Sequence, residues 1–187
     1  MSRHLQNFFA FQLGWVGCVG AAASKLPLLG LLIAVVVTGW HLWRSRTPFA
    51  ELKLIAVAVG IGSVCDSALL ATGWLSFPVG QPIPGIAPYW IIAMWAMFAT
   101  TLNDSLAWLT RRTLLACFCG AIFAPLAYWA GANMGALILL DPVPALAAIA
   151  GAWAAALPIL TIAARAFSAK QRTHGNASLS AEVTSHA

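Results

Sequence analysis

Residues 52–74 read LKLIAVAVGIGSVCDSALLATGW, with Lys53 near one end and Asp66 as the one acidic residue. An α-helix needs about 20 predominantly apolar residues to cross the hydrocarbon of a membrane. This run has that length and that composition, and no proline interrupts it. It therefore predicts a transmembrane helix that carries a carboxyl group at membrane depth.

The rest of the chain has the same character. The chain has 187 residues, of which 61% are hydrophobic and only 8% are charged. Soluble domains carry about 25% charged residues, so these few charges cannot cover a water-facing surface. The composition therefore predicts an all-α, polytopic transmembrane bundle of about six helices, with no soluble domain of any size.

Five other runs have a similar length and composition. The six predicted spans form an integral membrane domain over residues 1–167 and lie at residues 5–23, 26–43, 52–74, 89–109, 113–130 and 145–167. Residues 75–88 hold four prolines and two glycines and predict an irregular loop. Residues 131–140 are too short to cross, so they either extend the fifth helix or fold back before Asp141. The polar residues 168–187 predict a disordered cytoplasmic tail.

Basic residues are distributed unevenly between the two ends of the predicted spans. If the N-terminus is cytoplasmic, nine of the ten Lys and Arg residues lie on the cytoplasmic side and Lys25 alone lies outside. Cytoplasmic loops carry the excess of Lys and Arg, so we expect both termini in the cytoplasm. Tryptophans at the span ends predict an aromatic belt at each interface; these are Trp40, Trp43, Trp74, Trp90, Trp108 and Trp129.

Small residues recur at every fourth position in several spans. Gly14, Cys18 and Ala22 form one such row, and Ala147, Gly151 and Ala155 form another. Rows of this kind let helix backbones approach closely in lipid. They predict a compact bundle, with a dimer face as an alternative that leaves the oligomeric state open.

Two ionisable residues lie within predicted spans, where they are costly and mark candidate functional sites. A rise of 1.5 Å per residue places Asp66 and Asp104 at depths that differ by roughly 10 Å or more, which argues against a paired-carboxylate site. We expect Asp104 to form an interfacial ion pair with Arg111 or with the bases after the second span. Lys25, or hydroxyls and amides of neighbouring helices, are candidate partners of Asp66, for which a structural contact and a proton-handling role both stay open.

Other polar residues in the spans complete a candidate intramembrane polar site. Thr100 and Asn103 lie on one face of the fourth span with Ala96 and Ala107, and this row lines a cavity or joins two helices. Pro125 removes a hydrogen bond from the fifth span, as in the broken helices of transporters or in a plain kink. The residues of the candidate polar site are Asp66, Gln12, Thr100, Asn103, Asp104, Tyr128 and Asn133.

The sequence holds no motif for catalysis, a cofactor or a metal. His41 is the one histidine beside a span, and with no carboxylate near it in the sequence it predicts neither a metal site nor a catalytic triad. The four cysteines lie in apolar runs and are expected to be buried hydrophobes. The bases form no single patch, which argues against nucleic acid as a partner. An enzyme is therefore the least supported class.

Four stretches together resemble an uncharacterised bacterial inner-membrane family, domain of unknown function 2878. They read NFFAFQLGWVGCV from Asn7, GIGSVCD from Gly60, WIIAMWAMFATTLNDSLAWL from Trp90 and GAIFAPLAYWAGANMG from Gly120. The resemblance implies a small multi-span protein with no assigned reaction. Its members are often encoded near genes that resemble cyclopropane-fatty-acid synthases, which implies an accessory role in modifying membrane lipids.

Two functional hypotheses follow. The first is an accessory or scaffold protein of membrane-lipid metabolism, which binds lipids and other membrane proteins within the bilayer. Anionic headgroups would then meet the basic cytoplasmic face, formed by Arg44, Arg46, Lys53, Arg111 and Arg112. The alternative is a small proton- or cation-coupled transporter that uses Asp66.

Overall fold

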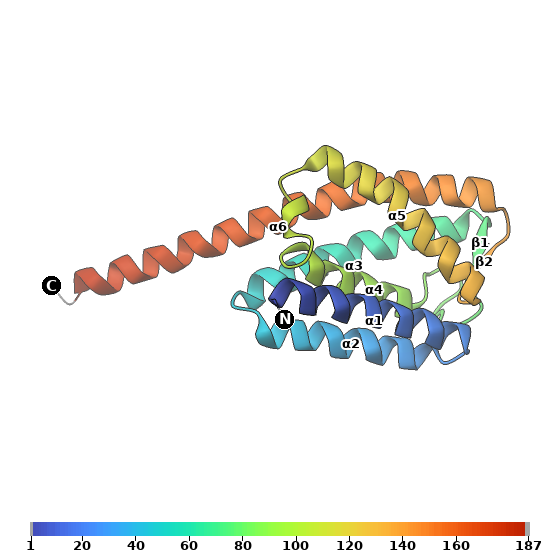
Figure 1. The fold of residues 1–187 in the computed structure, drawn as a ribbon, viewed down its shortest axis with the longest axis horizontal. Coiled ribbons are helices and arrows are strands. Elements are labelled where there is room, and N and C mark those ends of the chain that lie inside the picture. Colours follow the sequence, from blue (N-terminus) through green and yellow to red (C-terminus); the bar gives the residue numbers. More distant parts are fainter. Residues whose placement is uncertain (1, 186–187) are drawn as a thin grey trace.

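A computed structural model describes the backbone of residues 2–185 and the side chains of residues 2–169. Its helices are α1 (Arg3–Ala23), α2 (Pro27–Arg44), α3 (Pro48–Ala71), α4 (Tyr89–Leu102), α5 (Thr113–Met134) and α6 (Pro142–Ser185), with a short 3₁₀ helix at Ala107–Leu109. Two short strands, β1 (Leu75–Ser76) and β2 (Ile138–Leu139), complete the described chain (Figure 1). The prediction of an all-α bundle of about six helices is confirmed.

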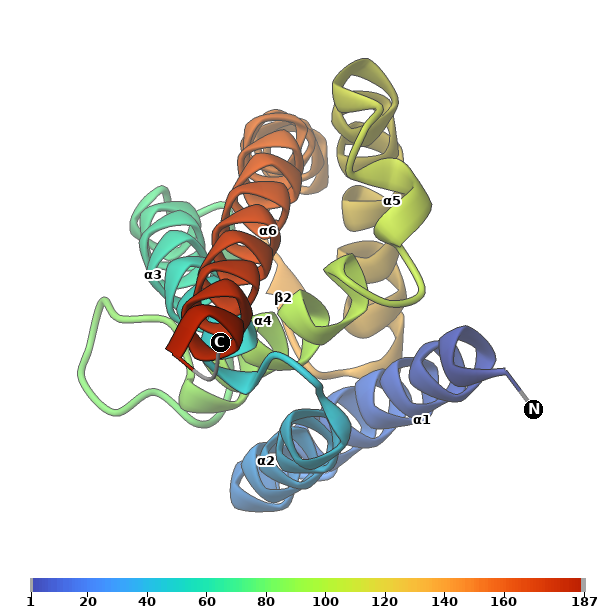
Figure 2. The ribbon, with the colours of Figure 1, turned by 90° about the vertical axis from the view of Figure 1, so that its left-hand side faces the viewer.

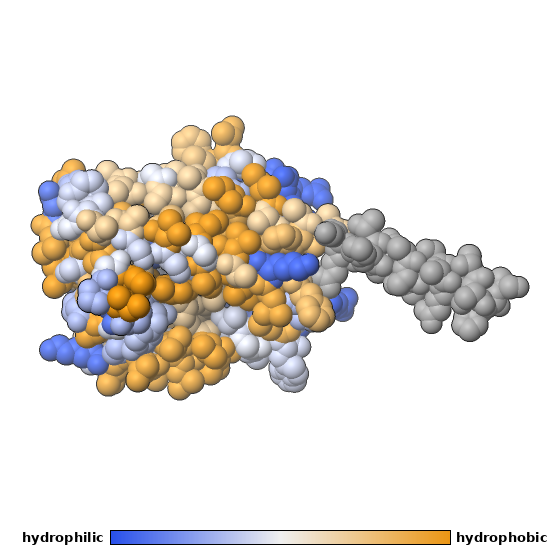
Figure 3. Space-filling view, turned by 180° about the vertical axis from the view of Figure 1, so that it is seen from behind, coloured by the Kyte–Doolittle hydropathy of each residue, from blue (hydrophilic) through white to orange (hydrophobic). Residues whose placement is uncertain are grey.

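Four of the helices are long and apolar enough to cross a membrane, namely α2, α3, α5 and α6. α1 has 21 residues but is less apolar, and α4 is a shorter apolar helix of 14 residues. Large apolar side chains face outward, among them Trp43 at 84% exposure and Val143 at 79%. Apolar residues cover much of the face in Figure 3, and the most hydrophilic residues lie toward its ends. The chain is therefore a membrane protein.

α4 is the central helix of the bundle. It packs against α1, α2 and α3, while α5 packs mainly on α6 (Figure 2). Trp90, Trp95 and Met97 of α4 are almost fully buried. This burial differs from the predicted tryptophan belt, because Trp90 packs inside the bundle whereas Trp43, Trp108 and Trp129 are exposed. Because α1 and α5 make few contacts with each other, the side of the bundle between them is left open.

The fourth span is shorter than predicted. α4 ends at Leu102, and the chain continues through a turn into the 3₁₀ helix before α5 begins. The Asn7 side chain accepts hydrogen bonds from the backbone N–H and the hydroxyl of Ser105, so contacts with α1 replace helical ones in this turn. The predicted row from Ala96 to Ala107 is therefore not one continuous helix face.

Residues 131–140 do not form a further crossing. α5 extends to Met134, and the chain then turns back so that β2 pairs with β1 in antiparallel register, Leu75 opposite Leu139 and Ser76 opposite Ile138. Residues 131–134 thus extend the fifth helix, and the residues after them fold back, so each of the two alternatives holds for part of the segment. Apart from β1, residues 75–88 form the predicted irregular loop.

α6 continues as a helix to Ser185, whereas we predicted a disordered tail from residue 168. The side chains of residues 170–187 lie outside the described part of the chain. The disorder predicted for residues 168–187 therefore stays a prediction.

The small-residue rows have different roles in the bundle. Gly14, Cys18 and Ala22 are buried, as expected of a helix contact. Gly151 lies on an exposed face of α6 and has no neighbouring atom within 4 Å of the position of an added Cβ. The close approach of α5 to α6 occurs at Gly120 instead, where a Cβ would lie 2.2 Å from the Trp153 carbonyl oxygen.

Candidate functional site

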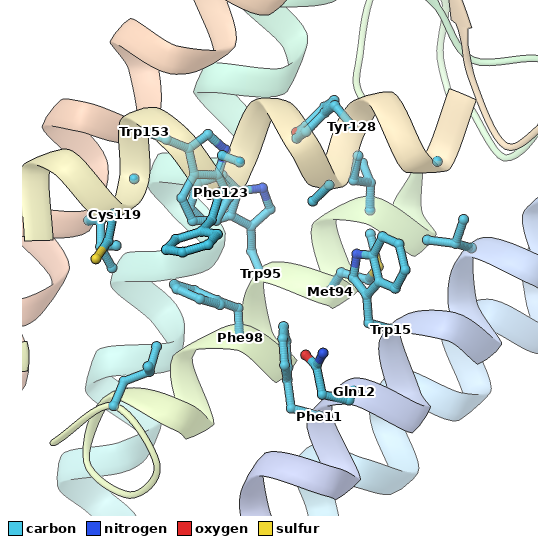
Figure 4. Close-up of a pocket in the computed structure, with 18 of the residues that line it drawn as sticks. Phe11, Gln12, Trp15, Met94, Trp95, Phe98, Cys119, Phe123, Tyr128 and Trp153 are labelled. Atoms are coloured by element: carbon cyan, nitrogen blue, oxygen red, sulfur yellow. The ribbon is translucent and has the colours of Figure 1, made fainter. Parts of the chain in front are cut away.

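An apolar groove of about 660 Å³ runs along the open side of the bundle, between α1 and α5 (Figure 4). α4 and α6 form its floor. Aromatic side chains make up much of its wall; they are Phe8, Phe11, Trp15, Trp90, Trp95, Phe98, Trp108, Phe123, Tyr128 and Trp153.

Helical periodicity explains how the groove is built. On α1 the lining residues include Phe8, Phe11 and Trp15, which are spaced by three and four residues and so lie on one face of the helix. On α5 the lining residues run from Cys119 to Gly131 with the same spacing. At 1.5 Å per residue this face of α5 gives the groove a length of about 18 Å.

The groove is open to the surroundings of the bundle. Phe8 on one rim is 44% exposed, and Phe123 on the facing rim is 65% exposed. The outer faces of the same helices carry exposed apolar residues such as Leu13 and Ile122. In a membrane these faces meet hydrocarbon, so the groove opens sideways into lipid chains rather than into water.

A buried carboxyl group lies behind the wall of the groove. Asp66 of α3 is 1% exposed, and the Trp95 Nε1–H donates to its Oδ2 at 2.7 Å. The Tyr128 hydroxyl donates to Oδ1. Trp95 stacks on Trp153 with ring centroids 4.2 Å apart. Asp66 thus joins α3, α4 and α5 at one point.

This arrangement decides between the predicted partners of Asp66. The Tyr128 hydroxyl, from a neighbouring helix, is an observed partner and was one of the predicted alternatives. Lys25 forms no ion pair with Asp66. The Trp95 indole was missed, because it lies 29 residues away in the sequence and no local pattern pairs it with Asp66. Among the described residues no basic side chain lies within 4 Å of this carboxyl group.

Gln12 lines the groove from the opposite wall. Its side chain projects from α1 toward α4 and α5, whose Trp95 and Tyr128 lie across the groove (Figure 4). The amide is exposed and makes no hydrogen bond with any described residue. The groove therefore has a polar group on a wall that is otherwise almost wholly apolar.

A second polar cluster lies at the end of the bundle that holds the N-terminus, which we call the N-terminal end. There Arg3 Nε donates to Asp104 Oδ2 at 2.8 Å, and His4 Nδ1 lies 3.1 Å from Asp104 Oδ1. The predicted ion pair of Asp104 with Arg111 or the bases after the second span is thus wrong. The cause is the turn after Leu102, which directs Asp104 toward the start of α1.

His41 and Glu51 belong to the same end and were missed. Both are 3% exposed, and His41 Nε2 lies 3.4 Å from Glu51 Oε2. The expectation that no carboxylate lies near His41 is therefore wrong. Glu51 lies just before the predicted third span, which begins at Leu52, but α3 begins at Pro48 and buries it. The short α2–α3 connection, which brings the two helix ends together, could have suggested the pair.

Neighbouring amides surround this pair without satisfying it completely. Asn103 Nδ2 donates to Glu51 Oε1 at 3.1 Å, and Asn7 Nδ2 lies 3.4 Å from His41 Nδ1. His41 Nε2 and Glu51 Oε2 have no hydrogen-bond partner. The cluster joins α1, α2, α3 and the end of α4, so it holds these helices together at the N-terminal end.

The residues of the predicted polar site therefore do not form one site. They lie at the groove, at the N-terminal end of the bundle and, for Asn133, at the surface. Asp66 and Tyr128 meet behind the groove, with Gln12 on its other wall. Thr100, Asn103 and Asp104 lie outside the groove, and the Thr100 hydroxyl donates to the Met97 carbonyl at 2.7 Å. Asn133 is exposed and donates to the Trp129 carbonyl at 2.7 Å.

The predicted headgroup contacts are all exposed: Arg44 ends α2, Arg46 follows it, Lys53 lies near the start of α3, and Arg111 and Arg112 precede α5. Arg44 donates to Gln6 Oε1 at 2.9 Å and lies over the Trp40 ring at 5.0 Å. No described group of three His, Cys, Asp or Glu residues could hold a metal ion.

Comparison with known proteins adds the family. No curated protein and no solved structure gives a significant match to the chain. A family model described as "Protein of unknown function (DUF2878)" matches residues 4–159, which include the groove and both polar clusters except Arg3. The chain therefore belongs to the DUF2878 family.

Proposed function

We propose that the protein binds a membrane lipid by taking one acyl chain into the groove. The observation that carries this proposal is the apolar cavity of about 660 Å³, open sideways between α1 and α5. Its aromatic lining offers dispersion contacts along a chain. Its length of about 18 Å is close to half of the roughly 30 Å hydrocarbon core, which is the depth of one leaflet.

The headgroup of such a lipid would lie at the N-terminal end. Phe8, Leu106 and Trp108 line this end of the groove, and Arg111 and Arg112 follow within a few residues. Exposed bases at a membrane surface attract anionic headgroups. Arg44 and Arg46, at the end of α2 and just after it, and Lys53, near the start of α3, add to the same basic face.

This geometry favours binding and presentation over a reaction on the lipid. The carboxyl group of Asp66 is bonded to Trp95 and Tyr128 and is not itself part of the groove wall. We therefore assign an accessory role, in which the protein holds or presents a lipid to partner enzymes in a bacterial inner membrane.

A pair of tryptophan substitutions tests the proposal. Ala127→Trp, in the groove, would fill the space for the chain, whereas Ala147→Trp, on an exposed face of α6, would not. After detergent extraction and washing, native mass spectrometry should find phospholipid on the wild type and on Ala147→Trp, and at least about tenfold less on Ala127→Trp. Equal retention by both variants would refute binding in the groove.

A second candidate function, coupled transport through Asp66, is favoured by one observation. This buried carboxyl group has no basic side chain within 4 Å among the described residues. Asp66→Asn keeps the side-chain shape but cannot exchange a proton, so a transporter would lose proton-coupled flux in vesicles while its expression stays normal. Lipid retention should be unchanged in the same variant if Asp66 is structural.

A further inference from the structure

Gln12 makes the groove unusual as a site for a plain hydrocarbon chain. The side chain amide of this residue lies at membrane depth, on the groove wall, and no described residue hydrogen-bonds to it. A polar group without a partner is costly in an apolar medium, and polar side chains within membranes are usually bonded to one another. Gln6, on the same helix, differs from Gln12 because its side chain accepts a hydrogen bond from Arg44.

The position of Gln12 indicates where a ligand would meet it. Gln12 lies four residues from Phe8 and seven from Val19, the lining residues toward the two ends of the groove on α1. At 1.5 Å per residue these separations are about 6 Å and about 10 Å. An amide at this place meets the middle of a bound chain and not its headgroup.

The opposite wall carries the other polar groups of the groove. Across from Gln12 lie Trp95 and Tyr128 (Figure 4). Their N–H and O–H both donate to Asp66, so neither is available as a donor to a ligand. The Tyr128 hydroxyl is directed to Asp66 behind the wall, so the Gln12 amide, with two donors and an acceptor, is the polar group that remains to meet a ligand. A group that both donates and accepts fits this amide best, which is the character of a hydroxyl group.

We propose that the groove selects acyl chains that carry a hydroxyl group near mid-chain, with Gln12 as the specificity-determining residue. This inference rests on the proposed binding of an acyl chain. The hydroxyl forms a hydrogen bond with the Gln12 amide, which can donate through its N–H and accept through its carbonyl oxygen, so the hydroxyl stays hydrogen-bonded when it leaves the interface. A plain chain binds in the same groove but leaves the amide unpaired.

The test compares two fatty acids on the purified, delipidated full-length protein. Stearate and a stearate with one hydroxyl near mid-chain compete for a fluorescent fatty acid in detergent. The wild type should prefer the hydroxylated chain by about tenfold, the scale of one satisfied hydrogen bond. Gln12→Leu should bind both chains equally, and Gln6→Leu, a matched change outside the groove, should keep the preference.

The outcomes separate this inference from the proposed function. If stearate binds but the wild type shows no preference, or if Gln12→Leu keeps it, selection by Gln12 is wrong and acyl binding stands. If a hydroxyl beside the carboxylate is preferred as strongly as one at mid-chain, recognition lies at the interface and the inference is also wrong. If neither chain competes, the proposed function itself is wrong.

Discussion

At the scale of single residues, Asp66 illustrates how a carboxyl group is accommodated at membrane depth. Its two oxygens accept hydrogen bonds from an indole and a phenol on two other helices, so the polar atoms satisfy one another away from lipid. The sequence alone identified Asp66 and Tyr128 as candidates, because polar residues in apolar runs are conspicuous. It could not pair them with Trp95, since that contact depends on how α3, α4 and α5 are packed.

Substitution of Asp66 should separate hydrogen bonding from charge. Asp66→Ala leaves the Trp95 N–H and the Tyr128 hydroxyl unpaired and buried, so we expect a loss of about 3 kcal/mol in the free energy of unfolding. Asp66→Asn can accept from Trp95 and donate to Tyr128, so its loss should stay within about 1 kcal/mol. Unfolding in mixed detergent measures both. Equal losses would show that the hydrogen bonds do not hold the three helices together.

Two glycines of α3 test the placement of Trp95. An added Cβ at Gly62 would lie 2.2 Å from the Trp95 ring, whereas at Gly60 it meets nothing within 4 Å. Gly62→Ala should therefore displace Trp95 from Asp66 and cost about 1–3 kcal/mol. Gly60→Ala should be neutral or stabilise by up to about 1 kcal/mol, because alanine favours helix. Thermal unfolding in detergent compares them, and a harmless Gly62→Ala would contradict the packing described.

At the scale of elements, hydropathy located the helices well and their ends less well. Long apolar runs predicted α2, α3, α5 and α6, because lipid imposes their length. The end of α4 at Leu102 was missed, since it depends on hydrogen bonds from the turn to Asn7 of α1. Similarly, the predicted third span began at Leu52 and left out Glu51, whereas α3 begins at Pro48 and holds Glu51 beside His41.

The contact between α2 and α3 can be measured through that pair. Removing one partner, as in Glu51→Ala or His41→Ala, leaves the other buried without it, and each should cost about 3 kcal/mol of stability. If the two side chains interact, the double variant should cost clearly less than the sum, by about 1 kcal/mol or more. A double-mutant cycle of unfolding free energies gives this coupling. Strict additivity would mean that the 3.4 Å approach carries no energy.

At the scale of the whole molecule, the groove follows from the order of packing. α1 packs on α2 and α4, and α5 packs on α6, so neither closes the side of α4 that lies between them. The sequence predicted a compact bundle from its small residues, but it could not show that one side stays open. A cavity along Thr100 and Asn103 was one of two alternatives for that row, but neither residue lines the groove, and the aromatic face of α4 lines it instead.

Labelling by a lipid chain within a membrane tests the groove most directly. The protein is reconstituted with a phosphatidylglycerol whose acyl chain carries a diazirine, and the labelled residues are mapped by mass spectrometry after irradiation. We predict labelling of Gln12 and Trp15 in the groove several-fold above that of Leu13 and Val16, which lie at similar depth on the outer face of α1. Labelling of Leu13 and Val16 at or above the level of the groove residues would contradict an acyl chain held in the groove.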